Sequence, residues 1–254
     1  MNVLEVWRHP VKSMQGERVA EADIDERGMA GDRRWGVLDV DTGKVLSAKR
    51  EGRLLEAAAT LTADGVPDVR LPDGSGFRAG EAALDDALST WLGRAVHVAL
   101  AEEGRSTAFE MNVVNDDETS ATIDFPCPPG TFLDAGAVHV LTTASLAAAG
   151  VLYPHGQWDV RRFRPTVVVE ADGDGFVEDG WIGSAVRVGG AELFVFAPTV
   201  RCAMPSRSQP GGLERDLEIV KTVNRHHGSN LGVYAAVRAP GRVAEGDDVV
   251  LVPA

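Results

Sequence analysis

Hydrophobic and polar residues alternate along much of this chain with the two-residue period that is typical of β-strands. In the first half, the alternation predicts strands at residues 3–8, 18–24, 35–39, 45–47, 57–62, 66–71 and 96–100. Turn residues such as Asp41-Thr42-Gly43 and Ala63-Asp64-Gly65 separate several of them. Short strands at close spacing, with little helix between them, favour a barrel or a sandwich.

The second half shows the same pattern and predicts strands at residues 138–141, 166–169, 185–188, 191–196, 231–237 and 248–252. Helices are expected to be few and short. One covers residues 84–92 and ends at Gly93; a second follows Thr142 or Thr143, covers 144–149 and ends at Gly150; a third covers 213–224.

Residues 102–132 look like a loop-rich connector, with an acidic stretch at Asp116, Asp117 and Glu118. A domain boundary is therefore expected in this region. The whole chain reads as a mainly β protein with a few short helices, built from two β-rich halves.

Composition narrows the class of protein. The 254 residues are 44% hydrophobic and 25% charged, as in ordinary globular proteins. The sequence contains no apolar run of the roughly 18 residues that a membrane span needs, and its N-terminus lacks the pattern of a secretory signal. We therefore expect a cytoplasmic protein without a membrane partner.

The net charge of −13 is unevenly distributed. Residues 1–53 hold 10 basic and 10 acidic residues, whereas the rest of the chain holds 15 and 28. The phosphates of nucleic acid would meet an acidic surface that repels them, so we expect no nucleic-acid partner. The cations gathered in the neutral segment indicate a small anionic ligand in a pocket, and solvated surface charge is the alternative.

Cys202 is the most informative residue. It follows the predicted strand at 191–196 and stands next to Arg201, and the chain has only one other cysteine, Cys127. A cation beside a cysteine favours the thiolate, which makes Cys202 a candidate metal ligand or nucleophile. A disulfide with Cys127 is the alternative, which a reducing compartment disfavours.

Basic and hydroxyl residues recur in short motifs: Lys12-Ser13, Asp32-Arg33-Arg34-Trp35, Arg161-Arg162-Phe163-Arg164-Pro165 and, near the end, Gly232-Val233-Tyr234. Lysine, serine and the planar fork of arginine suit phosphate oxygens. Each motif has an ordinary structural alternative. Asp32 could pair with either neighbouring arginine, Asp159 or Glu178 could satisfy the arginine cluster, and Tyr234 could be a core residue.

Taken together and in this order, these segments resemble the MOSC family, named for the C-terminal domain of molybdenum cofactor sulfurase, in its branch with an N-terminal β-barrel domain. The resemblance implies an N-terminal β-barrel domain at 1–98, packed on a MOSC domain with a β-barrel-like fold at 105–254. It also implies binding of the molybdenum cofactor (Mo-molybdopterin), a pterin that carries a dithiolene and a terminal phosphate.

The resemblance also implies roles for single residues. Cys202 matches the family's protein ligand to molybdenum and is the expected catalytic residue. The expected cofactor-binding residues are Lys12, Ser13, Arg33, Asp134, Arg164, Arg201 and Tyr234. Thiolate is a soft ligand that suits a metal already held by sulfur.

The function implied is an oxidoreductase that reduces N-hydroxylated or N-oxide-type small molecules. Two cysteines cannot hold an iron–sulfur cluster, so electrons must come from a separate donor protein. The chain departs from the family pattern at two places. It has Thr166 where the family usually has asparagine, and Pro205-Ser206 where the family often has threonines. These departures concern the identity of the substrate more than that of the cofactor. A persulfide carrier acting through Cys202 and a non-catalytic cofactor-binding module are the alternative hypotheses.

Overall fold

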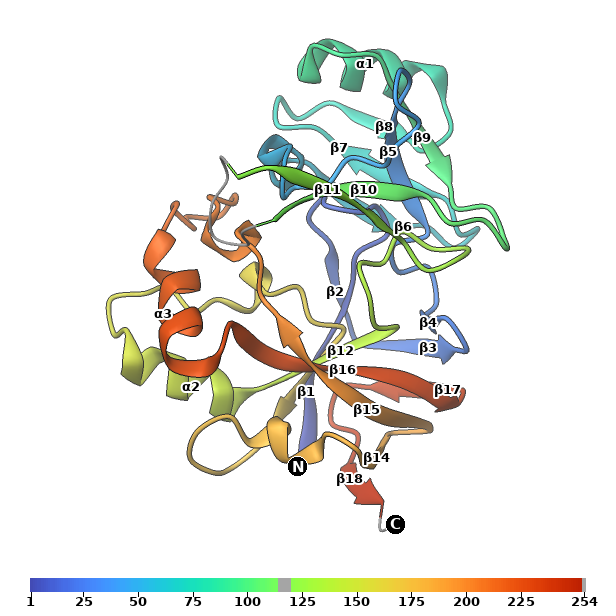
Figure 1. The fold of residues 1–254 in the computed structure, drawn as a ribbon. Helices are drawn as coiled ribbons and strands as arrows, with labels where there is room; N and C mark the ends of the chain where they lie inside the picture. Colours follow the sequence, from blue (N-terminus) through green and yellow to red (C-terminus); the bar gives the residue numbers. More distant parts are fainter. Residues whose placement is uncertain (114–119, 253–254) are drawn as a thin grey trace.

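The structure of this chain is a computed structural model that describes residues 1–113 and 120–252. Within these ranges it consists mainly of strands, with three helices: α1 (Ala82–Leu92), α2 (Thr143–Leu152) and α3 (Leu217–His227). Figure 1 shows a smaller upper part that carries α1 and a larger lower part that carries α2 and α3. The described residues include no helix long and apolar enough to span a bilayer.

The largest sheet forms the lower part of the molecule (Figure 1). In spatial order its strands are β18 (Val249–Val252), β14 (Ala185–Val188), β15 (Ala191–Val200), β16 (Asn230–Ala239), β12 (Val138–Thr142), β13 (Val167–Glu170), β1 (Asn2–Arg8) and β2 (Glu17–Val19). Neighbouring strands run antiparallel except β12 and β13, which are parallel. A parallel pair needs a crossover connection, and α2 lies in it.

The first strand of the chain therefore belongs to the sheet of the second half. β1 pairs with β13 on one side and with β2 on the other. The sheet also curls, so that Asn2 bridges to Asp248 and the Val3 amide donates to the Asp247 carbonyl over 2.8 Å. The described residues form no closed barrel. The expected mainly β fold with few short helices is confirmed, but its barrel character is that of a curled, open sheet.

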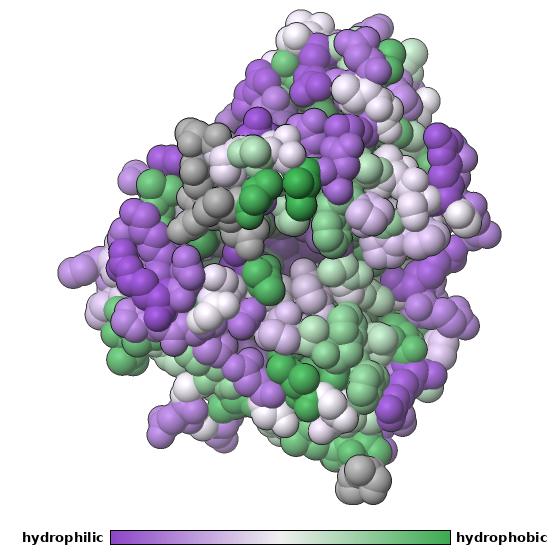
Figure 2. Space-filling model, in the orientation of Figure 1, coloured by the Kyte–Doolittle hydropathy of each residue, from purple (hydrophilic) through white to green (hydrophobic). Residues whose placement is uncertain are grey.

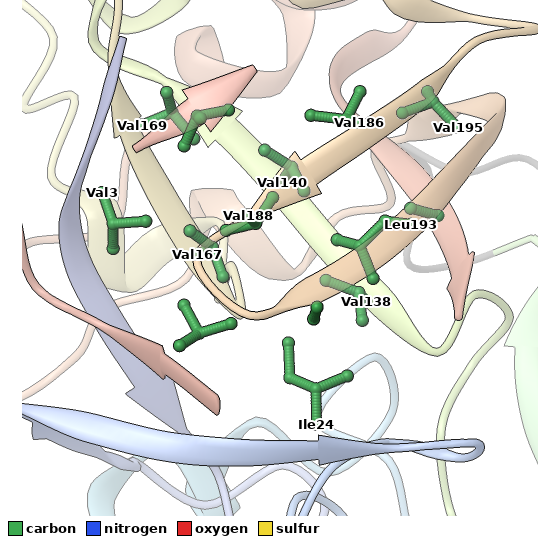
Figure 3. Packing of buried hydrophobic residues seen from close by; sticks show 14 of the residues in the cluster. Val3, Ile24, Val138, Val140, Val167, Val169, Val186, Val188, Leu193 and Val195 are labelled. Atoms are coloured by element: carbon green, nitrogen blue, oxygen red, sulfur yellow. The ribbon is translucent and has the colours of Figure 1, made fainter. Parts of the chain in front are cut away.

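Inward-facing residues of this sheet fill one hydrophobic core (Figure 3). The central strands contribute Val138, Val140, Val167, Val169, Leu193 and Val195. Their two-residue spacing places them on one face of each strand, and branched valine side chains pack well on a pleated surface. Val3 and Ile24 belong to the same core, which ties the beginning of the chain to the second half.

The upper part is built from two small groups of strands and α1. β5 (Trp35–Asp39) pairs with β9 (Val96–Leu100), and β7 (Pro67–Arg70) pairs with both β6 (Ala58–Leu61) and β8 (Gly76–Arg78). Helix α1 turns Leu84, Leu88 and Leu92 inward at four-residue spacing. Gly93, in the left-handed conformation, ends the helix as predicted.

A third small group of strands connects the two halves of the chain. β3 (Glu21–Asp25) pairs with β4 (Gly28–Met29) and with β17 (Gly241–Ala244), which lies more than 200 residues later. The predicted single strand at 18–24 is thus two strands, β2 and β3, that join different sheets. Strands β8 and β17 were not predicted.

The predicted loop-rich connector is wrong for part of its length. Residues 102–132 contain a β-hairpin, β10 (Ala108–Asn112) paired with β11 (Thr122–Pro126). The acidic residues 116–118 lie outside the described residues. The period-2 signal was short here, since each strand offers only two alternating large apolar residues, Phe109 and Met111 in β10 and Ile123 and Phe125 in β11, and every residue of β11 is exposed.

Several element ends also differ from the predictions. Residues 45–47 form only an isolated bridge between Val45 and Leu38, not a strand. Thr142 caps α2 as expected, but the helix passes Gly150 and ends at Leu152, and α3 begins at Leu217 rather than at 213. Asp216, whose side chain accepts from the Glu218 amide, supplies the N-cap that fixes the start of α3.

Candidate functional site

A cavity of about 370 Å³ lies where the upper and lower parts meet. Its walls come from the loops that follow β1 and β5, from the hairpin β10–β11, from residues 133–136 and from the end of β15. Figure 2 shows a hollow at the centre of this face of the molecule. Segments that are far apart in sequence therefore share one concave surface.

Seven of the eight predicted site residues line this cavity: Ser13, Arg33, Asp134, Arg164, Arg201, Cys202 and Tyr234. The eighth, Lys12, is buried behind the wall, where its Nζ donates to the Asp134 carboxylate and, over 2.7 Å, to the Phe132 carbonyl. The structure thus brings together residues that the sequence separates by up to 222 positions. Their roles toward a cofactor stay predictions.

Cys202 stands just beyond β15, which runs four residues further than predicted, to Val200. The Cys202 thiol is free and partly exposed, and Cys127 is free and buried. No disulfide joins the two, so the alternative pairing is not realised. A partly exposed thiol in a cavity wall is accessible to a ligand, whereas Cys127 lies in a hydrophobic core cluster.

Arg201 turns into the protein interior. Its Nη2 donates to the Phe163 carbonyl over 2.8 Å, and its guanidinium carbon lies 5.4 Å from the centre of the Phe163 ring. Burial lowers the pKa of Arg201, whereas Tyr234 and Cys202 act in the opposite direction. Its buried Nε has no hydrogen-bond partner among the described residues. A buried donor without a partner is costly, so a ligand atom here would stabilise it.

Arg164 is the second buried guanidinium of the cavity. Nη1 donates to the Met14 carbonyl over 2.6 Å, while Nη2 is buried with no hydrogen-bond partner in the described part of the chain. Burial and the neighbouring Arg33 lower the pKa of Arg164 to about 9. Arg33 donates to the Arg164 carbonyl over 3.1 Å and forms an ion pair with Asp32.

Strained backbone marks the same place. Four non-glycine residues in the described ranges have positive φ: Ser13 (70°), Arg33 (47°), Arg164 (53°) and Ser229 (68°). The first three line the cavity. Side chains rarely adopt this conformation, and such strain clusters at functional sites.

Asp134 links two lysines at the cavity wall. Lys12 and Lys49 both form ion pairs with its carboxylate, the latter over 3.0 Å. Both ammonium groups also lie 4.3 Å from the centre of the Phe109 ring. Burial opposes ionisation of Asp134, but the two lysines hold its pKa well below the usual range. One ionised carboxylate therefore pairs with two ammonium groups, and this part of the wall carries a net positive charge.

Tyr234 and His139 form the deeper wall from the neighbouring strands β16 and β12. Their ring centres are 5.8 Å apart. A Cβ on Gly136 would lie 2.7 Å from the Tyr234 ring, so only glycine lets the ring lie here. Burial and Arg201 lower the pKa of His139 well below its ordinary value, which leaves this imidazole neutral at pH 7.

Sequence reasoning missed three polar residues of the wall, Ser47, Lys49 and His139. Lys49 belongs to the basic part of the neutral segment, and that concentration of cations was the available signal. His139 gave none, because a lone histidine in an apolar strand is most simply read as core.

The arginine cluster at 161–164 divides into three separate environments. Arg161 forms an ion pair with Asp159, and Arg164 enters the cavity. Arg162 is fully buried and donates to the backbone carbonyls of Gln157, Pro205, Arg207 and Glu214. Glu178 pairs with none of them; its carboxylate accepts from the hydroxyls of Thr142 and Ser145.

The cavity suits an anionic ligand. Four cations line it, and the carboxylates at hand are Asp134 and, behind the wall, Asp32. Two buried guanidinium nitrogens of this lining, Nη2 of Arg164 and Nε of Arg201, still lack acceptors among the described residues. No cluster of three or more metal-ligating His, Cys, Asp or Glu side chains occurs in those residues. A metal at Cys202 would thus need most of its ligands from a bound group, and the donor set fits a metal carried by an anionic organic cofactor.

Comparisons with known proteins agree with this picture. The model of the MOSC N-terminal beta barrel domain matches residues 1–103, and the model of the MOSC domain matches residues 129–250. Mitochondrial amidoxime-reducing component 1 of Mus musculus is 24% identical over 293 residues, an alignment that covers 98% of this chain and 82% of that protein.

Two solved structures are also similar. The YuaD protein from Bacillus subtilis is 12% identical, with a TM-score of 0.48 over 98% of this chain and 93% of that chain. YiiM from Escherichia coli is 15% identical, with a TM-score of 0.36 over 59% of this chain and 70% of that chain.

Proposed function

This chain belongs to the MOSC family, and from that premise we propose that it binds the molybdenum cofactor and reduces N-hydroxylated or N-oxide-type small molecules. The mouse relative, named as an amidoxime-reducing component, supports the choice of substrate class. When bound, the cofactor supplies two-electron oxygen-atom-transfer chemistry at molybdenum. The substrate's N–O bond breaks, two electrons come from a donor protein, and two protons are taken up as the oxygen leaves as water.

The residues of this chain bind and orient the cofactor in this proposal. Cys202 would be the protein ligand of the metal. Arg33 and Arg164 would hold the phosphate and its surroundings, with the unpartnered Nη2 of Arg164 as a donor ready for an anionic oxygen. Ser13, whose hydroxyl accepts from the Ala48 amide over 2.8 Å, fixes the loop beside them.

Four further residues support the site. Asp134 keeps Lys12 and Lys49 in place, so that their charges remain at the wall. Tyr234 contributes a hydroxyl from β16. In this proposal the electrons come from a donor outside these 254 residues, whose two cysteines cannot hold an iron–sulfur cluster. We place the reaction in the cytoplasm, where reducing conditions keep both thiols free.

The observation that carries the proposal is one cavity that combines a free, partly exposed thiol with two buried guanidinium groups, each with a nitrogen lacking a partner in the described residues. Structural ion pairs would satisfy those nitrogens. A soft metal ligand next to unsatisfied cationic donors matches an anionic metal-bearing cofactor.

Metal analysis tests the proposal. Wild type, Cys202→Ala and the matched Cys127→Ala variant are produced in cells that make the molybdenum cofactor, and molybdenum and pterin are measured per chain. We expect near-stoichiometric molybdenum in wild type and in Cys127→Ala, because Cys127 lies outside the cavity wall. Cys202→Ala should lose molybdenum or change the absorption of the metal, and should lose reduction of amidoximes at least about a hundredfold.

Molybdenum-free wild type from such cells would contradict the proposal. A cyanide-releasable sulfur on Cys202 in that protein would instead support the persulfide carrier, which the partly exposed free thiol also allows.

A further inference from the structure

The cavity has a charged floor. Arg164, Arg201 and Lys49 are all buried, and their side chains line the inner wall. Cations in such a place attract anionic groups and repel cationic ones. The floor therefore suits the anionic cofactor of the proposed function and disfavours a positively charged substituent close to it.

The mouth of the same cavity is apolar. Phe125 of the hairpin is 37% exposed and Val200, at the end of β15, is 54% exposed. Met111 and Met204 are partly exposed and line the same cavity. Figure 2 shows hydrophobic side chains gathered around the central hollow. Apolar surface that stays in water is unfavourable, and its gathering at a cavity mouth marks a surface that a ligand covers.

The pairing of the hairpin explains why these side chains face the cavity. Phe109 pairs with Phe125 and Met111 pairs with Ile123. In a strand, residues two apart lie on the same face, so one face of the hairpin carries all four. Because Phe109, Met111 and Phe125 line the cavity, this face is turned toward it, and Ile123, also exposed, extends the apolar surface outward.

We propose that this apolar mouth, formed by Met111, Phe125, Val200 and Met204, binds an uncharged aryl substituent on the N-hydroxylated substrate. The inference rests on the proposed function, since the reducible nitrogen has to reach the end of the cavity that holds Cys202. The remainder of the substrate then lies between the hairpin and the end of β15. A flat ring there contacts the Phe125 ring and the thioethers, which are polarizable and make favourable contacts with aromatic rings.

Binding of two matched compounds tests the inference. Benzamidoxime and acetamidoxime carry the same reducible group and differ in a phenyl against a methyl substituent. Dissociation constants are measured with the cofactor-loaded protein and no electron donor, so no turnover occurs. We expect wild type to bind benzamidoxime at least about tenfold more tightly than acetamidoxime.

Variants of the mouth locate that preference. Phe125→Ala should weaken benzamidoxime binding about tenfold and Val200→Ala about threefold, with acetamidoxime binding and molybdenum content as in wild type. Val40→Ala is the matched control, because Val40 is 56% exposed and does not line the cavity. Phe125 and Val200 belong to different strands, β11 and β15, so a folding defect local to one variant would not affect the other.

Two results would overturn the inference: equal affinity of wild type for both compounds, or equal weakening of both by Phe125→Ala. Failure of the proposed function is read separately, from absence of molybdenum or from reduction of neither compound when a donor is supplied. With molybdenum-loaded protein, the two dissociation constants decide the aryl preference whether or not either compound is reduced.

Discussion

Ser13, Arg33 and Arg164 hold backbone conformations in which glycine would be less strained. Each such residue costs about 1 kcal/mol or more, so its side chain has to contribute something that glycine lacks. The Ser13 hydroxyl accepts a hydrogen bond from the Ala48 amide, and Arg33 forms an ion pair with Asp32. The Arg164 guanidinium donates to the Met14 carbonyl and lines the cavity. The strain is thus the cost of directing specific polar groups into one space.

His9 lies next to these residues and controls part of the response to acid. Burial and the charge of Arg164 lower the pKa of His9 to about 3. Burial alone would raise the pKa of Asp32, but Arg33 and the hydrogen bonds of His9 lower it to about 2. Above about pH 3, the folded protein therefore keeps His9 neutral and Asp32 ionised.

Acidification should destabilise the protein in two steps. Between about pH 6.5 and 3 the unfolded chain protonates His9 while the folded protein does not, so stability falls as pH falls. Below about pH 3.8 the stabilising charge of Asp32 is lost in turn, until the pH reaches about 2. His9→Gln should reduce the slope of unfolding free energy against pH by about 1.4 kcal/mol per pH unit between pH 4 and 5.5.

Urea titrations at several pH values measure this slope. The same slope in wild type and His9→Gln would contradict the assignment of a neutral buried imidazole.

At the scale of elements, the loop that carries Cys202 is held by arginine contacts to the backbone. Arg162 donates to the carbonyls of Pro205 and Arg207, three and five residues after the cysteine. Arg207 donates to the Lys49 carbonyl over 2.9 Å, and its guanidinium lies against Gly52, where a Cβ would be 2.5 Å from Nη1. These contacts fasten the cysteine loop to the segment that carries Lys49.

Loss of the Arg207 contact should loosen the cysteine loop without unfolding the protein. Arg207→Ala removes at least the hydrogen bond to the Lys49 carbonyl, worth about 1 kcal/mol, and should therefore raise the reaction rate of the Cys202 thiol with an aromatic disulfide reagent by at least about fivefold. Buried Cys127 should stay unreactive and reports on global unfolding.

Arg187→Ala, at an exposed position on β14, is the control and should react at the wild-type rate. An unchanged rate in Arg207→Ala would show that other contacts hold the loop.

For the whole molecule, the two halves share structure rather than only touching. β1 lies between β13 and β2 in the large sheet, and β3 pairs with β17 from the end of the chain. The cavity is walled by both halves. We infer that folding and assembly of the site are one cooperative process.

A fragment tests this cooperativity. Residues 105–254 lack β1, β2 and β3, and so expose one edge of β13 and part of the valine core. The fragment alone should show no cooperative thermal transition, whereas addition of residues 1–104 should restore one. The full chain should give coincident transitions by tryptophan fluorescence and by far-ultraviolet circular dichroism. A fragment that unfolds cooperatively by itself would contradict the inference and would favour the predicted boundary between residues 98 and 105 as a folding boundary.

The sequence by itself determined the mainly β character, because alternation and turn residues are local signals. It also predicted that Cys202 and the basic motifs share one site, and seven of the eight predicted site residues line one cavity. The tertiary structure alone decided which cations line the cavity. Arg161, Arg162 and Arg164 stand within four positions, yet one pairs with Asp159, one satisfies carbonyls and one lines the cavity. It also placed Lys49, His139 and one face of the hairpin at the cavity wall. These depend on contacts between distant segments, and local patterns carry no record of which strands become neighbours.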